Sequence, residues 1–579
     1  MELKRLIGCA SGREECDLLI KNVKIFNVFT GEISAGEIAL AGGKIAGIGY
    51  GYRGKSVYDG GGATAIPGLI DSHIHVESSL LSPEAFASLA AAHGTTGIVA
   101  DPHEIVNVCG IEGAEYIKEA FSRLSVGGVN PIDVYLQLPS CVPATPFETS
   151  GAVIDAEETA REIGRELFFG LGEMMNYPAV ISGEEETLEK LQAAQEACKP
   201  IDGHAPTVSG QLLNAYAASG IATDHESENT VECLEKIACG MFVQLRGGSS
   251  ASNLKSCASA VNEFNFRRFL ICSDDKNARD LMRKGHVDDA LRMLVQCGID
   301  PSHAVCMATK NVADCYGLRG KGAIAPAYDG DIVLVKDMLS FAVAAVFKAG
   351  VLTVENGKAL FDDEQKYFPA AVKNTVRIRS VKADDLKLDI KSGRARAMKV
   401  RPYGLISDEE IVSVDCKDGD VILEGTSLLK IAVVERHFAS GNIGLGLVKD
   451  FGLKGGAIGI TVAHDSHNMV ILGDNNGDMA RIAAALEKAG GGMAIVQNGK
   501  EYVFPLDIAG LMSSAPADEV IEKTESLTAI ARKMGVKDCY EPFMTPAFLS
   551  LAVIPALKLT DRGLFDVTKF EFTTVEVKA

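Results

Sequence analysis

Eight short apolar runs recur between residues 65 and 320, and Ala- and Glu-rich stretches with helical character separate them. The runs span residues 65–73, 95–103, 133–140, 167–173, 199–205, 221–226, 241–246 and 269–275. Helices are predicted between them, for example at 82–94, 156–167 and 184–198. Eight alternations of strand and helix over about 250 residues predict an α/β fold, a (β/α)₈ TIM barrel at residues 66–320. In such a barrel, functional side chains gather where the strands end.

The segments on both sides of this barrel have a different pattern, in which short β-type runs are interrupted by glycine. This pattern predicts strands joined by tight turns. We therefore expect a small composite β-sandwich domain built from residues 1–65 and 321–372, and an additional α+β C-terminal domain at residues 373–579. A chain of 579 residues is too long for one ordinary core, so several domains are expected.

Histidines and carboxylates occupy the ends of several predicted strands. They are His73, His75, Glu173, His204, His225 and Asp274. His73 and His75 are one residue apart, so the alternation of a strand directs both imidazoles to the same side. Imidazole and carboxylate ligands suit divalent zinc, manganese or iron. Six ligands exceed the need of one catalytic ion, and they predict two divalent metal ions that share a bridging carboxylate, Glu173.

Other polar residues at predicted strand ends have two interpretations each. A trio follows the second strand: Asp101, His103 and Glu104. The trio would contact the substrate, move a proton or hold an additional ion, or it would form a hydrogen-bonded loop cluster. Asp275 is the alternative to Asp274, and otherwise a cap of the next helix. Arg246, at the end of the seventh strand, is a candidate ligand-binding residue or a structural arginine.

The predicted C-terminal domain contains polar clusters of its own. The stretch ERHFASGN carries Arg436 and His437, and the stretch VAHDSHN carries His464, Asp465 and His467. These residues would close the site or bind a further ion, or they would be structural. The structural interpretation is favoured, because no alternating strand pattern orients these side chains.

Composition excludes several classes of protein. The formal net charge of −20 at pH 7 argues against a protein that binds nucleic acid through its phosphates. The 14 cysteines include no Cys-x-x-Cys pair, so no thiolate metal site or redox motif is predicted and a reducing compartment is expected. No apolar run suits a secretory signal or a membrane span. We expect a cytoplasmic protein without a nucleic-acid or membrane partner, and a homodimer or higher homo-oligomer.

The strand-end residues carry a family resemblance. An H-x-H pair on the first strand, histidines after the fifth and sixth strands and an aspartate after the eighth are similar to the amidohydrolase superfamily. The stretches PGLIDSHIHVESS, GLGEMMNYPAV, TDHES and CSDDK, with GNIGLGLVKDFGLKGG and PFMTPAFLSLAV near the C-terminus, resemble more narrowly the adenine deaminase family. Hydantoinase-like and dihydroorotase-like relatives commonly carry a carboxylated lysine on the fourth strand, where this chain has Glu173.

The resemblance implies an enzyme of purine salvage, a hydrolase that converts the small-molecule substrate adenine to hypoxanthine and ammonia. It implies Mn²⁺ as the metal, with Fe²⁺ or Zn²⁺ as alternatives, and a hydroxide bridging two ions as the nucleophile. One ion would be held by His73, His75 and Asp274 and the other by His204 and His225, with Glu173 between them.

In this interpretation Asp274 is both a ligand and the base that passes the proton of the nucleophile to the departing ammonia. Two other functions stay open. One is a related binuclear amidohydrolase that acts on a cyclic amide or N-acyl substrate, and the other is an inactive barrel that serves as a scaffold.

Overall fold

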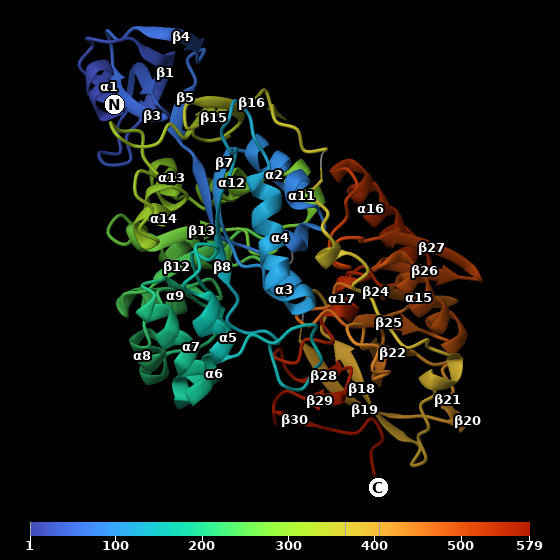
Figure 1. Cartoon of the computed structure of the whole chain (residues 1–579). Coiled ribbons are helices and arrows are strands. Elements are labelled where there is room, and N and C mark those ends of the chain that lie inside the picture. Colours follow the sequence, from blue (N-terminus) through green and yellow to red (C-terminus); the bar gives the residue numbers. More distant parts are fainter. Residues whose placement is uncertain (1, 250, 365, 405, 579) are drawn as a thin grey trace.

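Eight parallel strands form the barrel in the computed structural model (Figure 1), which describes residues 2–249, 251–364, 366–404 and 406–578. Each of the eight predicted apolar runs overlaps one of them, so the predicted barrel is confirmed. The strands are β6 (Leu69–Ile74), β7 (Thr95–Ala100), β8 (Asp133–Leu138), β9 (Gly170–Met174), β10 (Ile201–Gly203), β11 (Thr223–Asp224), β12 (Phe242–Arg246) and β13 (Phe269–Cys272).

Hydrogen bonds join these strands in two groups, β6 to β10 and β11 to β13. At one seam, Asp274 N donates to His73 O over 3.0 Å, and His75 N donates to Asp274 O over 3.2 Å. At the other seam, Ala222 N donates to Ile201 O over 3.0 Å. The ring therefore closes, although β10 and β11 are shorter than the predicted runs. At this seam the backbone N–H of Gly203 donates to the Thr223 hydroxyl over 3.2 Å.

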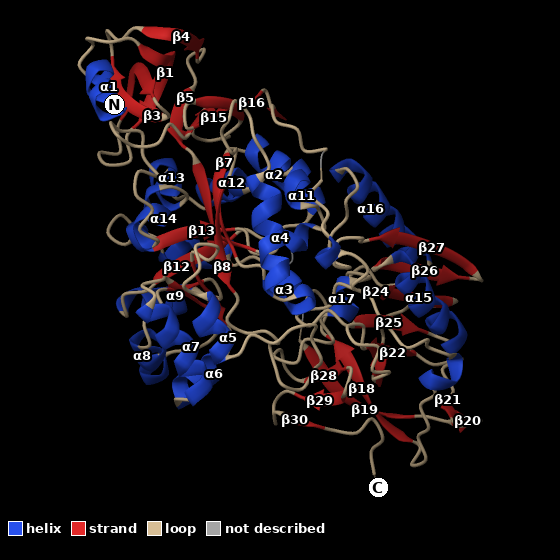
Figure 2. Cartoon of the chain, in the orientation of Figure 1, coloured by secondary structure: helices blue, strands red, loops and turns tan. Residues whose placement is uncertain are grey.

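Helices surround the barrel strands (Figure 2). They are α2 (Pro83–Ala92), α3 (His103–Cys109), α4 (Ile111–Ser122), α5 (Ala156–Glu162), α6 (Tyr177–Ser182), α7 (Glu185–Glu196), α8 (Gly210–Ala218), α9 (Thr230–Ala238), α10 (Leu254–Cys257), α11 (Ala278–Arg283), α12 (Val287–Gln296), α13 (Pro301–Met307) and α14 (Lys310–Cys315). Local chemistry sets their ends: the Ser82 side chain caps α2, and Pro83 occupies the first helical position. The predicted helix at 156–167 ends earlier, at Glu162, just before Gly164.

One nine-stranded sheet combines strands from before and after the barrel. It contains β1 (Cys16–Phe26), β2 (Ile33–Ala41), β3 (Lys44–Gly49), β4 (Gly54–Asp59), β5 (Thr64–Pro67), β14 (Ile332–Val335), β15 (Val343–Lys348), β16 (Val351–Glu355) and β17 (Lys358–Ala359). The junction is the antiparallel pairing of β5 with β14, in which Ala65 lies opposite Leu334. Helix α1 (Glu2–Ala10) packs on β2 and β3.

A second large sheet, of eight strands, dominates the C-terminal part. Its members are β18 (Arg394–Val400), β19 (Ser407–Ser413), β22 (Leu428–Val434), β23 (Ile443–Lys449), β24 (Gly456–Ile460), β25 (Met469–Gly473), β26 (Gly492–Gln497) and β27 (Lys500–Pro505). The C-terminal part also contains smaller elements outside this sheet: β20 (Cys416–Lys417), β21 (Asp420–Val421), β28 (Leu557–Thr560), β29 (Gly563–Asp566), β30 (Glu571–Phe572), α15 (Asn476–Ala489), α16 (Ala517–Lys533) and α17 (Met544–Ala547).

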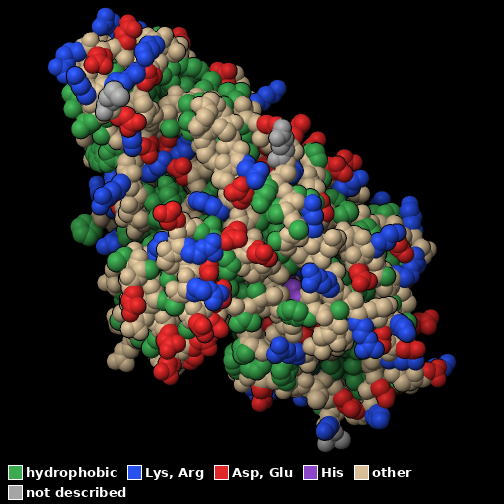
Figure 3. Space-filling model, viewed as in Figure 1, with side chains coloured by type: hydrophobic (Ala, Val, Ile, Leu, Met, Phe, Trp, Pro, Cys, Tyr) green, Lys and Arg blue, Asp and Glu red, His purple; other side chains and the backbone are tan. Residues whose placement is uncertain are grey.

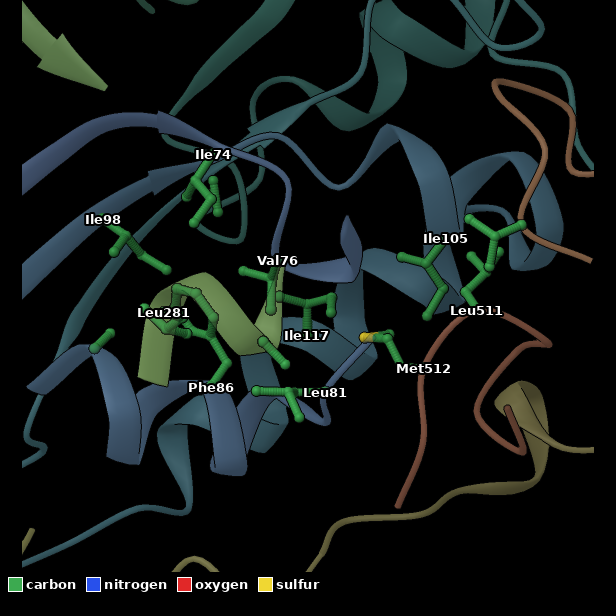
Figure 4. Close-up of a cluster of buried hydrophobic side chains, with 14 of the residues drawn as sticks. Ile74, Val76, Leu81, Phe86, Ile98, Ile105, Ile117, Leu281, Leu511 and Met512 are labelled. Atoms are coloured by element: carbon green, nitrogen blue, oxygen red, sulfur yellow. The ribbon is translucent and has the colours of Figure 1, made fainter. Parts of the chain in front are cut away.

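The C-terminal part packs directly on the barrel. Figure 4 shows Leu511 and Met512 beside the barrel residues Ile105 and Ile117, and all four belong to one buried apolar cluster. Backbone hydrogen bonds strengthen the junction, since Ser513 N donates to Leu80 O over 2.8 Å. This continuous core fixes the C-terminal side chains relative to the strand ends of the barrel.

The barrel loop of residues 139–155 also contacts the C-terminal part. The Ser466 hydroxyl donates to Glu148 Oε2 over 2.7 Å, and Thr149 N donates to Asp561 Oδ1 over 2.9 Å. Glu148 is fully enclosed, and burial together with the neighbouring Asp465 carboxylate raises the pKa of Glu148 to about 7. The loop is thus anchored by a carboxyl group that titrates near neutrality.

We expect the free energy of unfolding to decrease as the pH rises, because of Glu148. Folding raises the pKa of this carboxyl from about 4.5 to about 7, so the folded state binds its proton more tightly than the unfolded state does. The resulting stabilisation is complete below pH 4.5 and is lost as the pH rises through about 7. The variant Glu148→Gln should therefore lose less stability between pH 5 and pH 8, by up to about 3 kcal/mol, since one pKa unit is worth about 1.4 kcal/mol. Thermal unfolding across this pH range measures the difference, and parallel curves for the two proteins would contradict it.

The surface carries interspersed acidic and basic side chains on the face that Figure 3 shows, with acidic ones gathered over α6 and α7. None of the helices in the described part of the chain combines the length and apolarity that a bilayer span requires.

Candidate metal centre

The six predicted ligand residues lie together where the barrel strands end. His73 lies on β6 and His75 directly follows it, Glu173 lies on β9, His204 follows β10, His225 follows β11 and Asp274 follows β13. Five of the six are buried, and His204 is partly exposed. Side chains from five different strands thus converge at one end of the barrel, as the barrel fold predicts.

The strand-one histidines point at a common position. The Nε2 atoms of His73 and His75 are 3.2 Å apart. His75 Nδ1 lies 2.9 Å from the backbone oxygen of Asp101, so Nδ1 carries the proton and donates it. The lone pair of His75 Nε2 consequently faces the cluster, which is the tautomer that a metal-binding histidine requires.

Glu173 lies between two sets of imidazoles. Its Oε1 atom is 3.3 Å from His75 Nε2, while its Oε2 atom is 2.6 Å from His204 Nδ1 and 3.1 Å from His225 Nε2. Burial opposes ionisation, but the imidazoles of His204 and His225 hold the pKa of Glu173 well below its usual range. An ionised carboxylate with one oxygen toward each set has the geometry of a bridging ligand.

Asp274 completes the cluster from the opposite side. Its Oδ1 atom is 3.2 Å from His75 Nε2 and 3.7 Å from His73 Nε2, and its Oδ2 atom accepts from Arg246 Nη1 over 2.8 Å. Although burial opposes it, the Arg246 guanidinium holds the pKa of Asp274 well below its usual range. Its backbone has φ of +55°, an unfavourable conformation for a residue other than glycine that is tolerated at functional sites.

These donors fit divalent metal ions. Three groups of the predicted ligands have donor atoms within 4.8 Å of one another: His73 with His75 and Glu173, His73 with His225 and Asp274, and Glu173 with His204 and His225. The buried Nδ1 atoms of His73 and His225 have no hydrogen-bond partner among the residues that the structure describes. Imidazoles and carboxylates in this arrangement are the ligand types that zinc, manganese and iron accept.

Two of the three residues that follow the second barrel strand, Asp101 and His103, contact Glu173. Asp101 Oδ2 accepts from the backbone N–H of Glu173 over 2.9 Å, and a Cβ atom on Gly172 would lie 2.1 Å from this oxygen. His103 Nδ1 is 3.4 Å from Glu173 Oε1, and its Nε2 is 3.4 Å from Glu104 Oε1. Glycine at position 172 therefore lets Asp101 reach and position the backbone of Glu173.

Two histidines of the C-terminal part meet this trio. His464 Nδ1 lies 2.6 Å from Glu104 Oε1, and His467 Nε2 contacts Glu104 Oε2 at short range. All three side chains are buried. Glu104 is thus the point at which the C-terminal part joins the candidate metal centre.

Comparison with known proteins agrees with this geometry. Residues 64–353 match the model of the amidohydrolase family, and residues 404–571 match the adenine deaminase C-terminal domain. An adenine deaminase 2 of Desulfotalea psychrophila is 46% identical over 579 residues, which cover 99% of each chain. An adenine deaminase of Nitratidesulfovibrio vulgaris is 44% identical over 577 residues, again 99% of each chain. This chain belongs to the adenine deaminase family.

Among solved structures, a β-aspartyl dipeptidase from Fervidobacterium islandicum aligns with 15% identity and a TM-score of 0.43, over 61% of this chain and 99% of its own.

The structure shows the partners of two neighbours of the cluster in this adenine deaminase family member. Asp275 does not cap the next helix, because the Asn277 side chain caps α11. Its Oδ1 instead accepts from the Ser78 hydroxyl. Arg246 is mostly buried and binds both Asp274 and Glu226, contacts that fit a structural arginine as well as a ligand-binding one.

Sequence reasoning missed Glu226. Its Oε1 atom lies 3.6 Å from His225 Nε2 and 4.0 Å from His204 Nδ1, and it accepts from Arg246. It directly follows His225 in the sequence, and that adjacency to a predicted ligand is the signal that could have found it.

The remaining C-terminal candidates have structural partners. His437 Nε2 donates to the Ser466 carbonyl over 2.8 Å. Arg436 is fully buried, and its guanidinium donates to the carbonyl groups of His467 and Ala509. Both side chains therefore hold the loop that carries His464 and His467 in place.

Proposed function

We propose that this enzyme hydrolyses adenine to hypoxanthine and ammonia. Membership of the adenine deaminase family over the full length supports the substrate. The observation that carries the proposal is the position of Glu173 between two sets of imidazoles at the strand ends. A carboxylate there replaces the carboxylated lysine common among hydantoinase-like relatives.

The proposal assigns two divalent ions to the cluster, with Mn²⁺ as the native metal and Fe²⁺ or Zn²⁺ as alternatives. His73, His75 and Asp274 would hold one ion, His204 and His225 the other, and Glu173 both. When bound, such ions lower the pKa of water toward neutrality and so supply a hydroxide nucleophile.

The protein residues then orient the groups and move the proton. Asp274 Oδ1 faces the strand-one imidazoles, where it takes a proton from the nucleophile and passes it to the departing amine. Arg246 fixes the other oxygen, so the reacting oxygen keeps its direction. The C-terminal part contacts this end of the barrel through Glu104.

The proposal also divides the chain into the predicted domains, residues 1–65 with 321–372, residues 66–320 and residues 373–579. The strand pairing supports this division, because the eight-stranded C-terminal sheet and the nine-stranded sheet share no strand. A role in purine salvage, a cytoplasmic location and a homodimer or higher homo-oligomer complete the proposal.

An assay with and without metal tests the function. The protein is treated with a chelator, reloaded with Mn²⁺ and incubated with adenine, and both ammonia release and the shift in purine absorbance are followed. We expect equal amounts of ammonia and hypoxanthine with Mn²⁺, almost none without it, and little reaction with adenosine. Ring opening of hydantoin or dihydroorotate without ammonia release from adenine would favour the cyclic-amide alternative. Failure to bind metal or turn over any of these substrates would favour a scaffold.

A further inference from the structure

A cavity of about 670 Å³ lies between the barrel and the C-terminal part. Ser78 and Asp275 line it from the barrel, and His464 and Phe548 line it from the C-terminal part. Apolar side chains such as Val462 form much of the remaining wall. A mostly apolar cavity with a few converging polar groups is the usual environment of a small-molecule ligand.

The barrel side of this cavity adjoins the candidate metal centre. Asp275 directly follows Asp274, and Ser78 lies three residues after His75. The Ser78 hydroxyl donates to Asp275 Oδ1 and fixes that carboxylate at the cavity wall. One wall of the cavity is therefore formed by residues adjacent in sequence to the predicted ligands Asp274 and His75, and the opposite wall by the C-terminal part; the six predicted ligands are not themselves among the lining residues.

The geometry of His464 leaves one polar atom for such a molecule. Its Nδ1 atom is held by Glu104 at 2.6 Å, and its ring stacks on Phe548 with centroids 4.9 Å apart and planes inclined by 10°. Its Nε2 atom takes part in no hydrogen bond with any residue within the described ranges of the chain. Burial opposes protonation, but Glu104 raises the pKa of His464 to about 9, so both ring nitrogens carry protons at neutral pH.

His467 differs from His464 although both contact Glu104. The backbone N–H of Ala463 donates to His467 Nδ1 over 3.0 Å, so both ring nitrogens of His467 have protein partners. His467 is almost completely buried and does not line the cavity. The two histidines therefore share one carboxylate, and only His464 can contact a ligand.

We propose that the purine base binds in this cavity and that His464 Nε2 donates a hydrogen bond to one of its ring nitrogens. The inference rests on the proposed function for the identity of the base. It makes the C-terminal part a component of the substrate site, with His464 as a substrate-binding residue and Phe548 and Glu104 as residues that position it.

Equilibrium binding of hypoxanthine tests the inference, because the reaction product binds without turnover. Protein loaded with Mn²⁺ is titrated calorimetrically, and metal content and thermal stability are measured on the same samples. We expect His464→Ala to weaken binding by about 10- to 100-fold, as the loss of a charged hydrogen bond predicts. It should raise the KM for adenine by a similar factor while metal content stays unchanged. His467→Ala is the matched control, since it also removes one imidazole from Glu104, and we expect less than about a threefold change in binding.

Equal weakening in both variants, or unchanged binding in His464→Ala, would overturn the inference. If His464→Ala does not fold, His464→Phe is used in its place, because it retains a ring against Phe548. The same weakening of hypoxanthine binding is expected. The two proposals fail separately. A wild-type protein that releases no ammonia from adenine, yet binds hypoxanthine with this pattern, rejects the function and retains the site. A deaminating enzyme without the pattern rejects only the site.

Discussion

The variant Asp274→Asn should lower kcat for adenine by about 10²- to 10⁴-fold, the range that a positioned general base contributes. Asparagine can retain an oxygen at the position of Oδ1, 3.2 Å from His75 Nε2, but it cannot accept a proton there. Its other terminal group loses the charge that binds Arg246. The substitution removes one negative charge, but four imidazoles and Glu173 remain as ligands. We therefore expect the amount of bound metal to change little.

The adjacent variant Asp275→Asn is the control for this assignment. Asp275 contacts Ser78 rather than the imidazoles, so its replacement should leave the proton transfer intact. Steady-state kinetics with adenine and metal analysis of both purified variants separate the two residues. If Asp275→Asn abolished turnover and Asp274→Asn left it near normal, the assignment of the base to Asp274 would be wrong.

The barrel and the convergence of its polar side chains were readable from the sequence for a physical reason. The parallel strands of a closed barrel all end on the same side, so a polar residue that ends an apolar run is expected at that end of the barrel. The alternation of a strand likewise directed His73 and His75 to one point. Short-range patterns of this kind place residues such as Glu173 and Asp274 without any knowledge of tertiary contacts.

The contacts made by the C-terminal part were not readable in the same way. His464 and His467 lie in a loop between β24 and β25, so no periodicity orients them. Their direction depends on how the C-terminal part packs on the barrel, through Glu104 and residues such as Leu511. The partners of Glu226 and Arg246 likewise depend on distances between loops, which sequence spacing does not determine.

The variant Glu173→Gln should have the other large effect, the loss of bound metal together with activity. Four groups of donor atoms in the described part of the chain could hold an ion, and three of them contain Glu173, one of these together with Asp101 and His103. Its two oxygens face separate sets of imidazoles, at 3.3 Å from His75 and 2.6 Å from His204. A neutral amide offers one oxygen instead of two charged ones, and it presents N–H donors to imidazole nitrogens.

Asp101→Asn provides the comparison that gives the Glu173 result its meaning, because Asp101 supports the backbone of Glu173 without supplying the bridging carboxylate. Loss of a supporting partner typically lowers metal affinity by about 10- to 100-fold, and we expect Glu173→Gln to exceed that range. Metal content after dialysis, measured alongside ammonia release, ranks the two variants. A Glu173→Gln protein that keeps two ions per chain would show that the imidazoles and Asp274 suffice, and the bridging role would have to be abandoned.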